Sequence, residues 1–446
     1  MRRAADRGAA WTWLTGGLGA AVLALASGCT GGSVVPSQSP TVPTGHLLWW
    51  DISTLAGAAA ADQNLVAGFV QANPGVSVDV VVMSPDEAHG KFDTAAQTAA
   101  VAPDVITVQA SWIPDWSARG YLARLDDTVA ADGARDVFPS LLPMEKFDGR
   151  LMAAVRSADG LALLYNKQLL AKAGVAIPRT WADVAAAKLK LSAREVQTLY
   201  APATGEGLLP WIYGEGGSLV DPEAKTILVS QPAAVAGLSQ RLNMAATGAA
   251  VDDSALWANS TSPPNDVTTQ TMRSAFRSGT VAMILDHAAA VPLLVGGSAF
   301  SAPSQIGIAP VPAGSVQSSG PVTATAYAVF SGSHNLLAAD QFVSYAQSPG
   351  QQADLAAELG LVPTRPGAFT DPRVAADPTI SAFEPVIKEG TALPQVQQQS
   401  SLLFPLDDNM RSALLGDLSA QAAMDAVAAQ YQKLLNVGYT IGPGPS

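Results

Sequence analysis

The residue types that most often carry out covalent or acid–base chemistry are sparse in this chain. The only cysteine is Cys29, and the four histidines, His46, His89, His287 and His334, are far apart. No G-x-S-x-G, H-E-x-x-H or P-loop pattern occurs. A glycosidase needs two carboxylates facing one bond, and no local pattern pairs the plentiful acidic residues. The sequence therefore favours a binding protein over an enzyme, with no catalytic residue, metal or cofactor expected.

The lone cysteine follows a segment typical of an export signal. Three arginines, at positions 2, 3 and 7, precede a mostly apolar run over 11–26. That run is short for a membrane-spanning helix, which needs about 20 residues. Small residues then lead to Cys29, as in a bacterial lipoprotein signal, although Ala26 stands where that pattern prefers Leu, Val or Ile. We expect a signal peptide over 1–28 and lipidation of Cys29; the alternative is a signal cleaved elsewhere.

Composition limits the partners and the location. The formal net charge is −12 over 446 residues and the isoelectric point is near 4.7. Such acidity argues against nucleic acid or an anionic membrane surface as a partner. Residues 30–45 are rich in Gly, Ser and Pro without charge, so we expect a flexible tether over 29–45. The length predicts two or three domains. We expect the lipid on Cys29 to hold them at the outer face of the cell membrane.

Strands and helices alternate along the body of the chain. Apolar or β-branched segments predict buried strands over 46–53, 76–83, 102–109 and 280–286. Segments with helical periodicity lie between and after them, for example at 232–248 and 269–277. This alternation predicts an α/β fold with sheets flanked by helices.

Six segments, taken in order, resemble those of one known family. They are "NPGVSVDV" (73–80), "PDVITVQASWIPDWSARGYLARLDD" (103–127), "ADGLALLYNKQLLAKAGVAIPRTWADV" (158–184), "GEGGSLVD" (214–221), "MRSAFRSGTVAMILDH" (272–287) and "LGLVPTRPGAFTDPRV" (359–374). The third is the most specific. Together they resemble the carbohydrate-binding extracellular solute-binding proteins of ABC importers, family 1, the maltose/maltodextrin-binding group. The resemblance covers residues 46–435.

The resemblance implies a two-lobe periplasmic-binding-protein fold of type II, with a ligand cleft between the lobes and closure by hinge bending. It assigns 46–156 and 288–327 to the N-terminal lobe. It assigns 157–287 and 328–435 to the C-terminal lobe, and leaves 436–446 as a loose tail. The implied partners are a saccharide and the transmembrane subunits of a permease, with the receptor itself a monomer.

Sugar binding needs polar groups for the hydroxyls and aromatic rings for the apolar face of the ring. Clefts in such folds are lined by loops after strand ends. Candidate contacts that follow predicted strands are Asp51, Ser53, Gln109, Ser111, Trp112, Asp286 and His287. The resemblance adds Asp159 and Glu206, which match positions of sugar-binding acids. The chemistry of sugar binding also selects Trp257, Tyr327, Arg365 and Phe404.

Each candidate has a structural alternative. Trp112 suits a packed loop as well as a sugar contact, and His287 suits a hydrogen-bonded loop residue. Asp159 and Glu206 suit solvated loops. Arg365 suits a surface pair. Trp181, at the predicted start of a helix, is expected to be structural.

Two departures from the family point to a ligand other than a long maltodextrin. Where related chains carry a stacking tryptophan after "GP", this chain has alanine in "DHAAA", and a later one is replaced by Leu403 beside Phe404. We therefore expect a mono-, di- or short oligosaccharide. The alternatives are a polyamine or peptide receptor and, in another class, a secreted carbohydrate-active enzyme.

Overall fold

A computed structural model describes residues 43–98, 101–126, 136–252, 254, 264–435 and 438–442, with the backbone alone at 264–268. The expected signal peptide, Cys29 and Trp257 lie outside the described residues. Within the described part of the chain, no helix is both long enough and apolar enough to cross a membrane.

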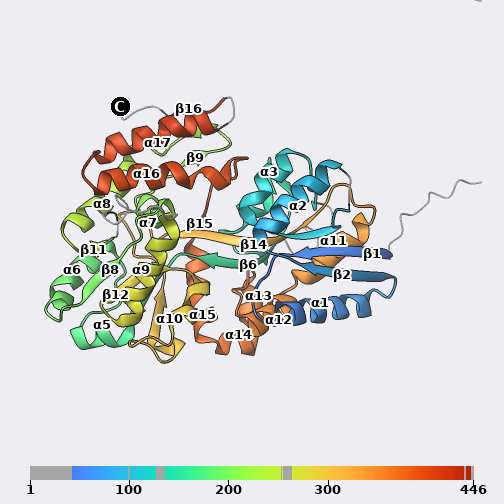
Figure 1. The fold of residues 1–446 in the computed structure, drawn as a ribbon, viewed down its shortest axis with the longest axis horizontal. Helices are drawn as coiled ribbons and strands as arrows, with labels where there is room; N and C mark the ends of the chain where they lie inside the picture. The colour runs from blue at the N-terminus through green and yellow to red at the C-terminus, as the bar shows by residue number, and fades with distance from the viewer. Residues whose placement is uncertain are drawn as a thin grey trace, which may run out of the picture. The chain divides into compact units, whose positions relative to one another are not determined.

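The first sheet has the strand order β15–β14–β3–β1–β2, and β6 also pairs with β14 (Figure 1). Its strands are β1 (Gly45–Asp51), β2 (Val76–Val82), β3 (Val105–Gln109), β6 (Ala154–Gly160), β14 (Pro321–Val329) and β15 (Thr391–Ala392). The central strand β1 runs parallel to β2 and β3, whereas β14 runs antiparallel to β3 and β6. The carboxyl ends of β1 and β3 therefore meet at one edge.

Helices cover both faces of this sheet. Adjacent residues of a strand point to opposite faces, so Trp49 and Trp50 of β1 enter different cores. Trp49 packs against Phe342, and Trp50 belongs to the core that contains Phe92 and Trp116. The helices involved are α1 (Ala58–Ala72) and α11 (Leu336–Ala346) on the Trp49 side, and α2 (Pro85–Thr98) and α3 (Ile113–Ala118) on the other.

The second sheet has the order β11–β8–β12–β7–β13. Its strands are β7 (Ala162–Asn166), β8 (Gln197–Tyr200), β11 (Ala250–Val251), β12 (Val281–Asp286) and β13 (Ile306–Ala309). The surrounding helices are α5 (Lys167–Ala173), α6 (Trp181–Ser192), α7 (Gly205–Gly214), α8 (Pro232–Ala246), α9 (Pro264–Ser278), α10 (Val291–Leu294), α16 (Leu403–Leu414) and α17 (Ala420–Leu434).

The start of α6 explains the structural role expected for Trp181. Thr180 and Asp183 form a capping box at this end, each side chain accepting from the other residue's backbone N–H. The indole of Trp181 then stacks on Trp211 of α7, with ring centroids 4.1 Å apart and planes 11° from parallel. Trp181 is therefore a core residue, as predicted.

Three segments connect the two sheets. β6 continues through Leu161 into β7, β13 leads back to β14, and β15 leads on to α16 (Figure 1). Two sheets flanked by helices and joined by crossing strands confirm the predicted fold class. Between β14 and β15 lie the helices α12 (Pro349–Leu359), α13 (Pro366–Phe369), α14 (Pro372–Ala376) and α15 (Pro378–Glu389).

The lobe boundaries differ from those expected. β13 falls in the range assigned to the N-terminal lobe, yet it pairs with β7 in the second sheet. α11 falls in the range assigned to the C-terminal lobe, yet it packs on β1 and β14 of the first sheet. The lobe to which a segment belongs depends on its pairing with distant strands, and local sequence patterns do not indicate that pairing. We call the first sheet with its helices the N-terminal lobe and the second sheet with its helices the C-terminal lobe.

Short strands complete the fold. They are β4 (Lys146–Phe147) with β5 (Arg150–Leu151), and β9 (Val220–Asp221) with β10 (Thr226–Ile227) and β16 (Thr440–Ile441). β16 lies within 436–446, which the sequence predicted as a loose tail. Its pairing with β10 corrects that prediction for Thr440 and Ile441.

Candidate ligand-binding site

The end of β12 supplies two neighbouring polar residues to the candidate site. Asp286 is buried, and its carboxylate accepts two hydrogen bonds from Arg273 of α9, at 2.7 and 2.8 Å. Asp286 Oδ1 also accepts from the backbone N–H of His287 at 2.9 Å. This bidentate pair fixes the turn from which the His287 ring projects. Arg273 was not predicted from the sequence.

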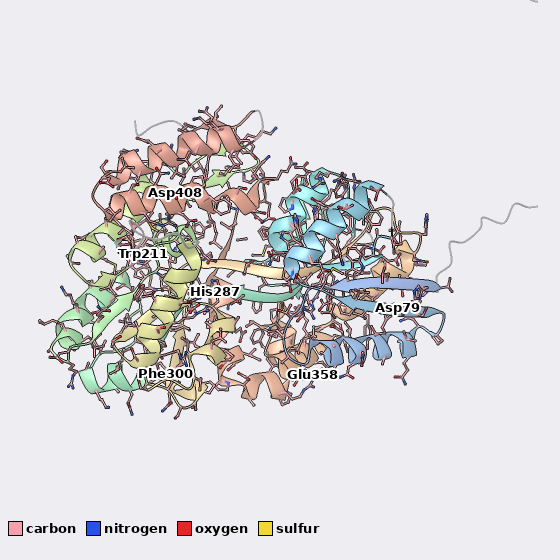
Figure 2. The ribbon with its side chains drawn as sticks, in the orientation of Figure 1. Asp79, Trp211, His287, Phe300, Glu358 and Asp408 are labelled. Atoms are coloured by element: carbon pink, nitrogen blue, oxygen red, sulfur yellow. The ribbon has the colours of Figure 1, made fainter. Side chains whose placement is uncertain are left out.

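His287 lies between two carboxylates that come from distant parts of the chain. Its Nδ1 is 3.6 Å from Asp159 Oδ1, and its Nε2 is 3.3 Å from Glu206 Oε2. Figure 2 shows His287 beside the strands that connect the two sheets. The side chains of His287, Asp159 and Glu206 remain 23%, 28% and 40% exposed. We call these three residues the carboxylate–histidine triad.

The charges of the triad stabilise one another. Burial by itself lowers the pKa of His287, but the charges of Glu206 and Asp159 outweigh burial and raise that pKa well above 6.5. Burial raises the pKa values of Asp159 and Glu206, but the positive charge of His287 and its hydrogen bonds bring both below their ordinary values. At neutral pH the triad is therefore a cation held between two anions.

Each carboxylate is positioned by its own element. Asp159 lies near the end of β6, and its Oδ1 accepts from the backbone N–H groups of Gly160 and Ala288. Glu206 lies in the first turn of α7, where the sequence predicted a contact loop. Thr204 caps that helix by accepting from Gly207 N–H, and Asp407 accepts from Gly205 N–H. The helix start therefore holds Glu206 more rigidly than a loop would.

A cavity of about 210 Å³ opens beside the triad. Asp159 does not line it but contacts His287, which does. Phe404 lies at the start of α16, and 63% of its surface is exposed. The lining residues with polar or aromatic groups include Glu206, Arg273, Asp286, His287, Ser400 and Phe404. The arrangement can bind hydroxyl groups through carboxylates and cations and can cover an apolar ring face.

The N-terminal lobe reaches this region through the residues after β3. Ser111 lies in the short helix η1 (Ala110–Trp112), and its carbonyl accepts from the hydroxyl of Ser400 at 3.3 Å. Gln397 donates to Asp115 Oδ1 at 3.0 Å. Gln109 is exposed at the end of β3. Ser111 and Gln109 therefore lie on the opposite lobe from His287 and Glu206, and Ser111 contacts the segment that carries Ser400.

The chain matches the family model for bacterial extracellular solute-binding proteins over residues 53–353. It belongs to that family. A probable ABC transporter-binding protein of Deinococcus radiodurans is 32% identical over 143 residues, which are 29% of this chain and 34% of that protein. A probable sugar-binding periplasmic protein of Rhizobium meliloti is 34% identical over 91 residues, 20% of this chain and 22% of that protein. The chain thus matches about a third or less of each curated relative's length.

Solved structures share the fold of this solute-binding protein. The GacH receptor of Streptomyces glaucescens GLA.O has a TM-score of 0.73 and 32% identity, covering 89% of this chain and 100% of that chain. That receptor was solved unliganded and in complex with acarbose and an acarbose homolog. The family and its structural relatives are binding proteins rather than enzymes.

Two predicted contacts of the solute-binding protein are instead core residues of the N-terminal lobe. Asp51 and Tyr327 are fully buried. Tyr327 accepts from Arg156 Nε at 3.1 Å, and Arg156 Nη1 lies 3.9 Å from Asp51 Oδ1. The prediction failed for Asp51 because Arg156 of β6 and Asp62 of α1 pack against the end of β1. Ser53 is half-buried and donates its N–H to Asp51 Oδ2.

Two further predictions are corrected by packing. Trp112 is only 8% exposed, and its ring packs against His89 and Trp116 at centroid distances of 5.0 and 5.3 Å. It is a packed residue of η1, which was the structural alternative. Arg365 is 2% exposed and donates to Gln347 Oε1 at 2.5 Å. It is therefore neither a ligand contact nor a surface residue.

Sequence reasoning missed Arg273, Ser400 and Asp407, which line the same cavity. Ser400 and Asp407 follow β15 and lie beside Glu206, about two hundred positions away in the sequence. The only indication in the sequence that Ser400 and Asp407 could belong to the site was their position close to Phe404, a predicted contact. Arg273 had a stronger signal, because it lies on the helix that precedes β12.

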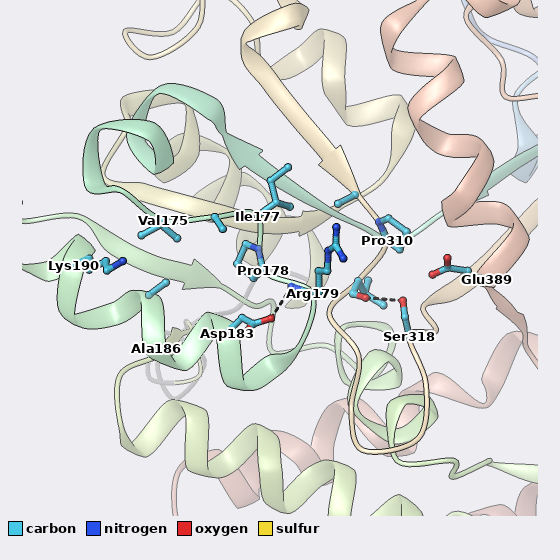
Figure 3. Close-up of a pocket in the computed structure, with 14 residues that line it drawn as sticks. Val175, Ile177, Pro178, Arg179, Asp183, Ala186, Lys190, Pro310, Ser318 and Glu389 are labelled. Atoms are coloured by element: carbon cyan, nitrogen blue, oxygen red, sulfur yellow. Dashed lines mark hydrogen bonds between the residues drawn. The ribbon is translucent and has the colours of Figure 1, made fainter.

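Larger cavities lie elsewhere in the described part of the chain. Figure 3 shows one of about 830 Å³ on the C-terminal lobe, between the loop that carries Arg179 and the segment of Pro310. None of the predicted ligand contacts lines it. Size alone therefore does not identify the ligand-binding site.

Proposed function

We propose that this solute-binding protein is the receptor of an ABC importer and that it captures a mono-, di- or short oligosaccharide at the carboxylate–histidine triad. The observation that carries the proposal is the triad itself, partly exposed beside a cavity that is also lined by Ser400, whose hydroxyl donates to the Ser111 carbonyl of the N-terminal lobe. Carboxylates that are ionised but not fully buried can accept hydrogen bonds from sugar hydroxyls. The relatives that bind sugars, including the GacH receptor with acarbose, support this ligand class.

The geometry supports hinge closure as the mechanism. The strands β6 and β14 belong to the connections between the lobes, with Asp159 on β6. The residues after β3 lie on one lobe, and His287 and Glu206 lie on the other. A sugar that touches both sides would hold the lobes together. The permease would then recognise the closed form.

We propose binding without turnover. A glycosidase needs one carboxylic acid that stays protonated near neutral pH, beside an ionised partner. The pKa values of Asp159 and Glu206 are both lowered, so both are ionised. Burial raises the pKa of Asp407, but its carboxylate is committed to the backbone N–H of Gly205.

A polyamine receptor is less favoured by the charges. A polyamine site needs several acids without compensating cations. Here His287 and Arg273 each supply a positive charge to the acids around them. Neutral hydroxylated ligands suit this balance better than polycations.

The test is thermal unfolding of residues 46–446 with mono- and disaccharides, and with spermidine and peptides as controls. A ligand at 100 times its dissociation constant stabilises the fold by about 2.7 kcal/mol, a shift of a few degrees for a protein of this size. Stabilisation by one class of sugar, lost in Glu206→Ala, is the expected result. Stabilisation by spermidine or a peptide alone, or hydrolysis of a sugar at enzymatic rates, would contradict the proposal.

The lipid anchor is a separate part of the proposal. Cys29 lies outside the described residues, so the support is the sequence pattern alone. The protein would then be held at the outer face of the cell membrane as a monomer. Cys29→Ser should release it into the medium, measured by blotting membrane and medium fractions. Retention of that variant on the membrane would rule out anchoring through Cys29.

A further inference from the structure

One stretch of this acidic chain, residues 167–195, is basic. It contains six cations and two acids, a net charge of +4, whereas the whole chain carries −12. The stretch forms α5, the loop after it and α6, which lie at the end of the C-terminal lobe remote from β1 and β2 (Figure 1). We call its cations the basic face: Lys167, Lys172, Arg179, Lys188, Lys190 and Arg194.

The charges of the basic face are available to an outside partner. All six side chains belong to residues that are exposed or half-buried. Within the described residues, none of them forms an ion pair with an acid. Lys190 Nζ donates instead to the carbonyl of Gly174, and Lys167 Nζ to the carbonyl of Ser304, each at 2.9 Å. An ammonium group has three donors, so each lysine keeps donors for an anion.

The acids near the basic face do not cancel its charge. Asp183 Oδ2 accepts from the backbone N–H groups of Arg179 and Thr180, at 3.0 Å each, and so is committed to the start of α6. Glu195 lies beyond the end of α6. Glu389 stands across the cavity from Lys190 (Figure 3). The cations therefore outnumber the acids that could pair with them.

Two aliphatic side chains project among these cations. Leu189 is 81% exposed, next to Lys190 and on the side of α6 away from the buried Val184. Ile177 is 48% exposed and lines the cavity of Figure 3 together with Arg179 and Lys190. A single exposed leucine needs no explanation. Aliphatic groups set among cations, however, match the boundary between lipid headgroups and acyl chains.

We propose that the basic face docks on an anionic phospholipid surface. The cations contact lipid phosphate groups, and Leu189 and Ile177 enter the boundary below them. A lipid surface fits cations that are spread over two helices and a loop, because its anionic groups are mobile and need no matching pocket. At 0.1 M salt, charges beyond about 10 Å are screened, so the nearest cations outweigh the net negative charge of the chain. The inference does not depend on the solute that the triad binds.

The experiment uses residues 42–446 without a lipid, because this part forms one compact unit. Binding is measured by co-sedimentation with phosphatidylcholine vesicles that contain phosphatidylglycerol. We expect binding at low salt that is lost at high salt and is absent with phosphatidylcholine alone. The double variant Arg179→Gln with Arg194→Gln should weaken it about 20- to 30-fold, because each cation contributes about fivefold. Leu189→Ser should weaken it several-fold.

A matched variant separates the position of the cations from the net charge. Arg150→Gln with Lys433→Gln removes two exposed cations outside the basic face, so both double variants change the net charge equally. We expect this control to bind like the unaltered chain. Within the described residues, neither the Arg179 nor the Arg194 guanidinium donates a hydrogen bond, so the unfolding temperature should stay unchanged.

Three results would overturn the proposal. The first is the absence of binding to the anionic vesicles at low salt. The second is an equal loss of binding in the two double variants, which would show that the basic face is not the contact. The third is equally strong binding to phosphatidylcholine alone, which would show that charge is not what the surface recognises.

Discussion

Two charge clusters each hold one cation between two carboxylates, but only one of the two is accessible. In the N-terminal lobe, Arg156 lies 3.9 Å from Asp51 and 3.6 Å from Asp62, and the three side chains are 0–2% exposed. The triad joins His287 and Glu206 of the C-terminal lobe to Asp159 of the connecting strand β6, has similar distances and is 23–40% exposed. The same residue chemistry therefore serves two different environments.

The difference appears in the pKa values of the acids. Burial, with the neighbouring charge of Asp51, raises the pKa of Asp62 to about 7. In the triad, the charge of His287 brings the pKa values of Asp159 and Glu206 below their ordinary values. Burial raises the pKa of every one of these acids, and at Asp62 the neighbouring carboxylate of Asp51 adds to that effect. At Asp159 and Glu206 the charge and hydrogen bonds of His287 outweigh it, so both acids stay ionised. A buried charge cluster thus holds a core together, and a half-exposed one can bind.

The largest expected effect breaks the buried cluster. Arg156→Ala removes the cation and leaves Asp51 and Asp62 facing each other within the core. We expect it to lower the free energy of unfolding by about 3–5 kcal/mol, measured by urea denaturation. The matched control is Arg373→Ala, whose partners Asp354 and Asp371 are on the surface, so its expected loss is much smaller. Equal losses for the two variants would show that burial does not distinguish these clusters.

The next effect concerns binding rather than stability. Asp159→Asn and Glu206→Gln keep the shape of the triad but remove the charge of one carboxylate. We expect each to weaken binding of the sugar identified by the thermal panel about 10–100-fold, because hydrogen bonds to charged groups contribute about 1.5–3 kcal/mol. Calorimetry measures this, and the unfolding temperature without sugar should change little. Unchanged affinity in both variants would remove the triad from the site.

The protonation of His287 gives a direct electrostatic test. Its pKa is raised in the folded protein, so its contribution to stability is complete below pH 6.5 and is lost as pH rises through the raised value. The carboxylates have lowered pKa values, so their contribution is complete above pH 4.5 and is lost on acidification. NMR titration should find His287 titrating well above 6.5, and Asp159→Asn should move it downward. A value near 6.5 in the unaltered protein would contradict this picture.

The smallest expected effect is a change in the pH dependence of stability when Asp62 of the buried cluster is replaced. A raised pKa means that the folded protein binds this proton more tightly, so stability is complete below pH 3.8 and falls as pH rises through about 7. Asp62→Asn should remove part of the loss of stability between pH 5.5 and 8.5, on the order of 1 kcal/mol. Asp79→Asn, at an exposed residue, is the control. An unchanged pH dependence in Asp62→Asn would argue that Asp62 is already ionised at pH 5.5.

Local patterns predicted the elements well because they depend on short-range periodicity and turns. The predicted strand 76–83 is β2 at Val76–Val82, and the predicted strand 280–286 is β12 at Val281–Asp286. The predicted helix 232–248 is α8 at Pro232–Ala246. The helix start at Glu206 was missed because two glycines flank it, a pattern more typical of a turn. Thr204 and Asp407 overcome that low propensity through capping.

The candidate site could be predicted only in part. Asp159, Glu206 and His287 were each selected, yet no pattern indicated that the histidine would lie between the two acids. Asp51 was selected by the same argument as Asp286, since both follow a strand. Asp51 is inaccessible because Asp62 and Arg156 cover it from α1 and β6. The position of a residue at a strand end is a local property, whereas its exposure depends on what packs over it.

The sequence by itself determined the α/β elements, the acidic surface and the family, because each depends on residue types along a continuous stretch. The tertiary structure decided which lobe holds β13 and α11, because pairing and packing join segments more than a hundred residues apart. It also decided which of two similar charge clusters faces a cavity. Accessibility is set by every element that packs around a group, and that information is spread over the whole chain.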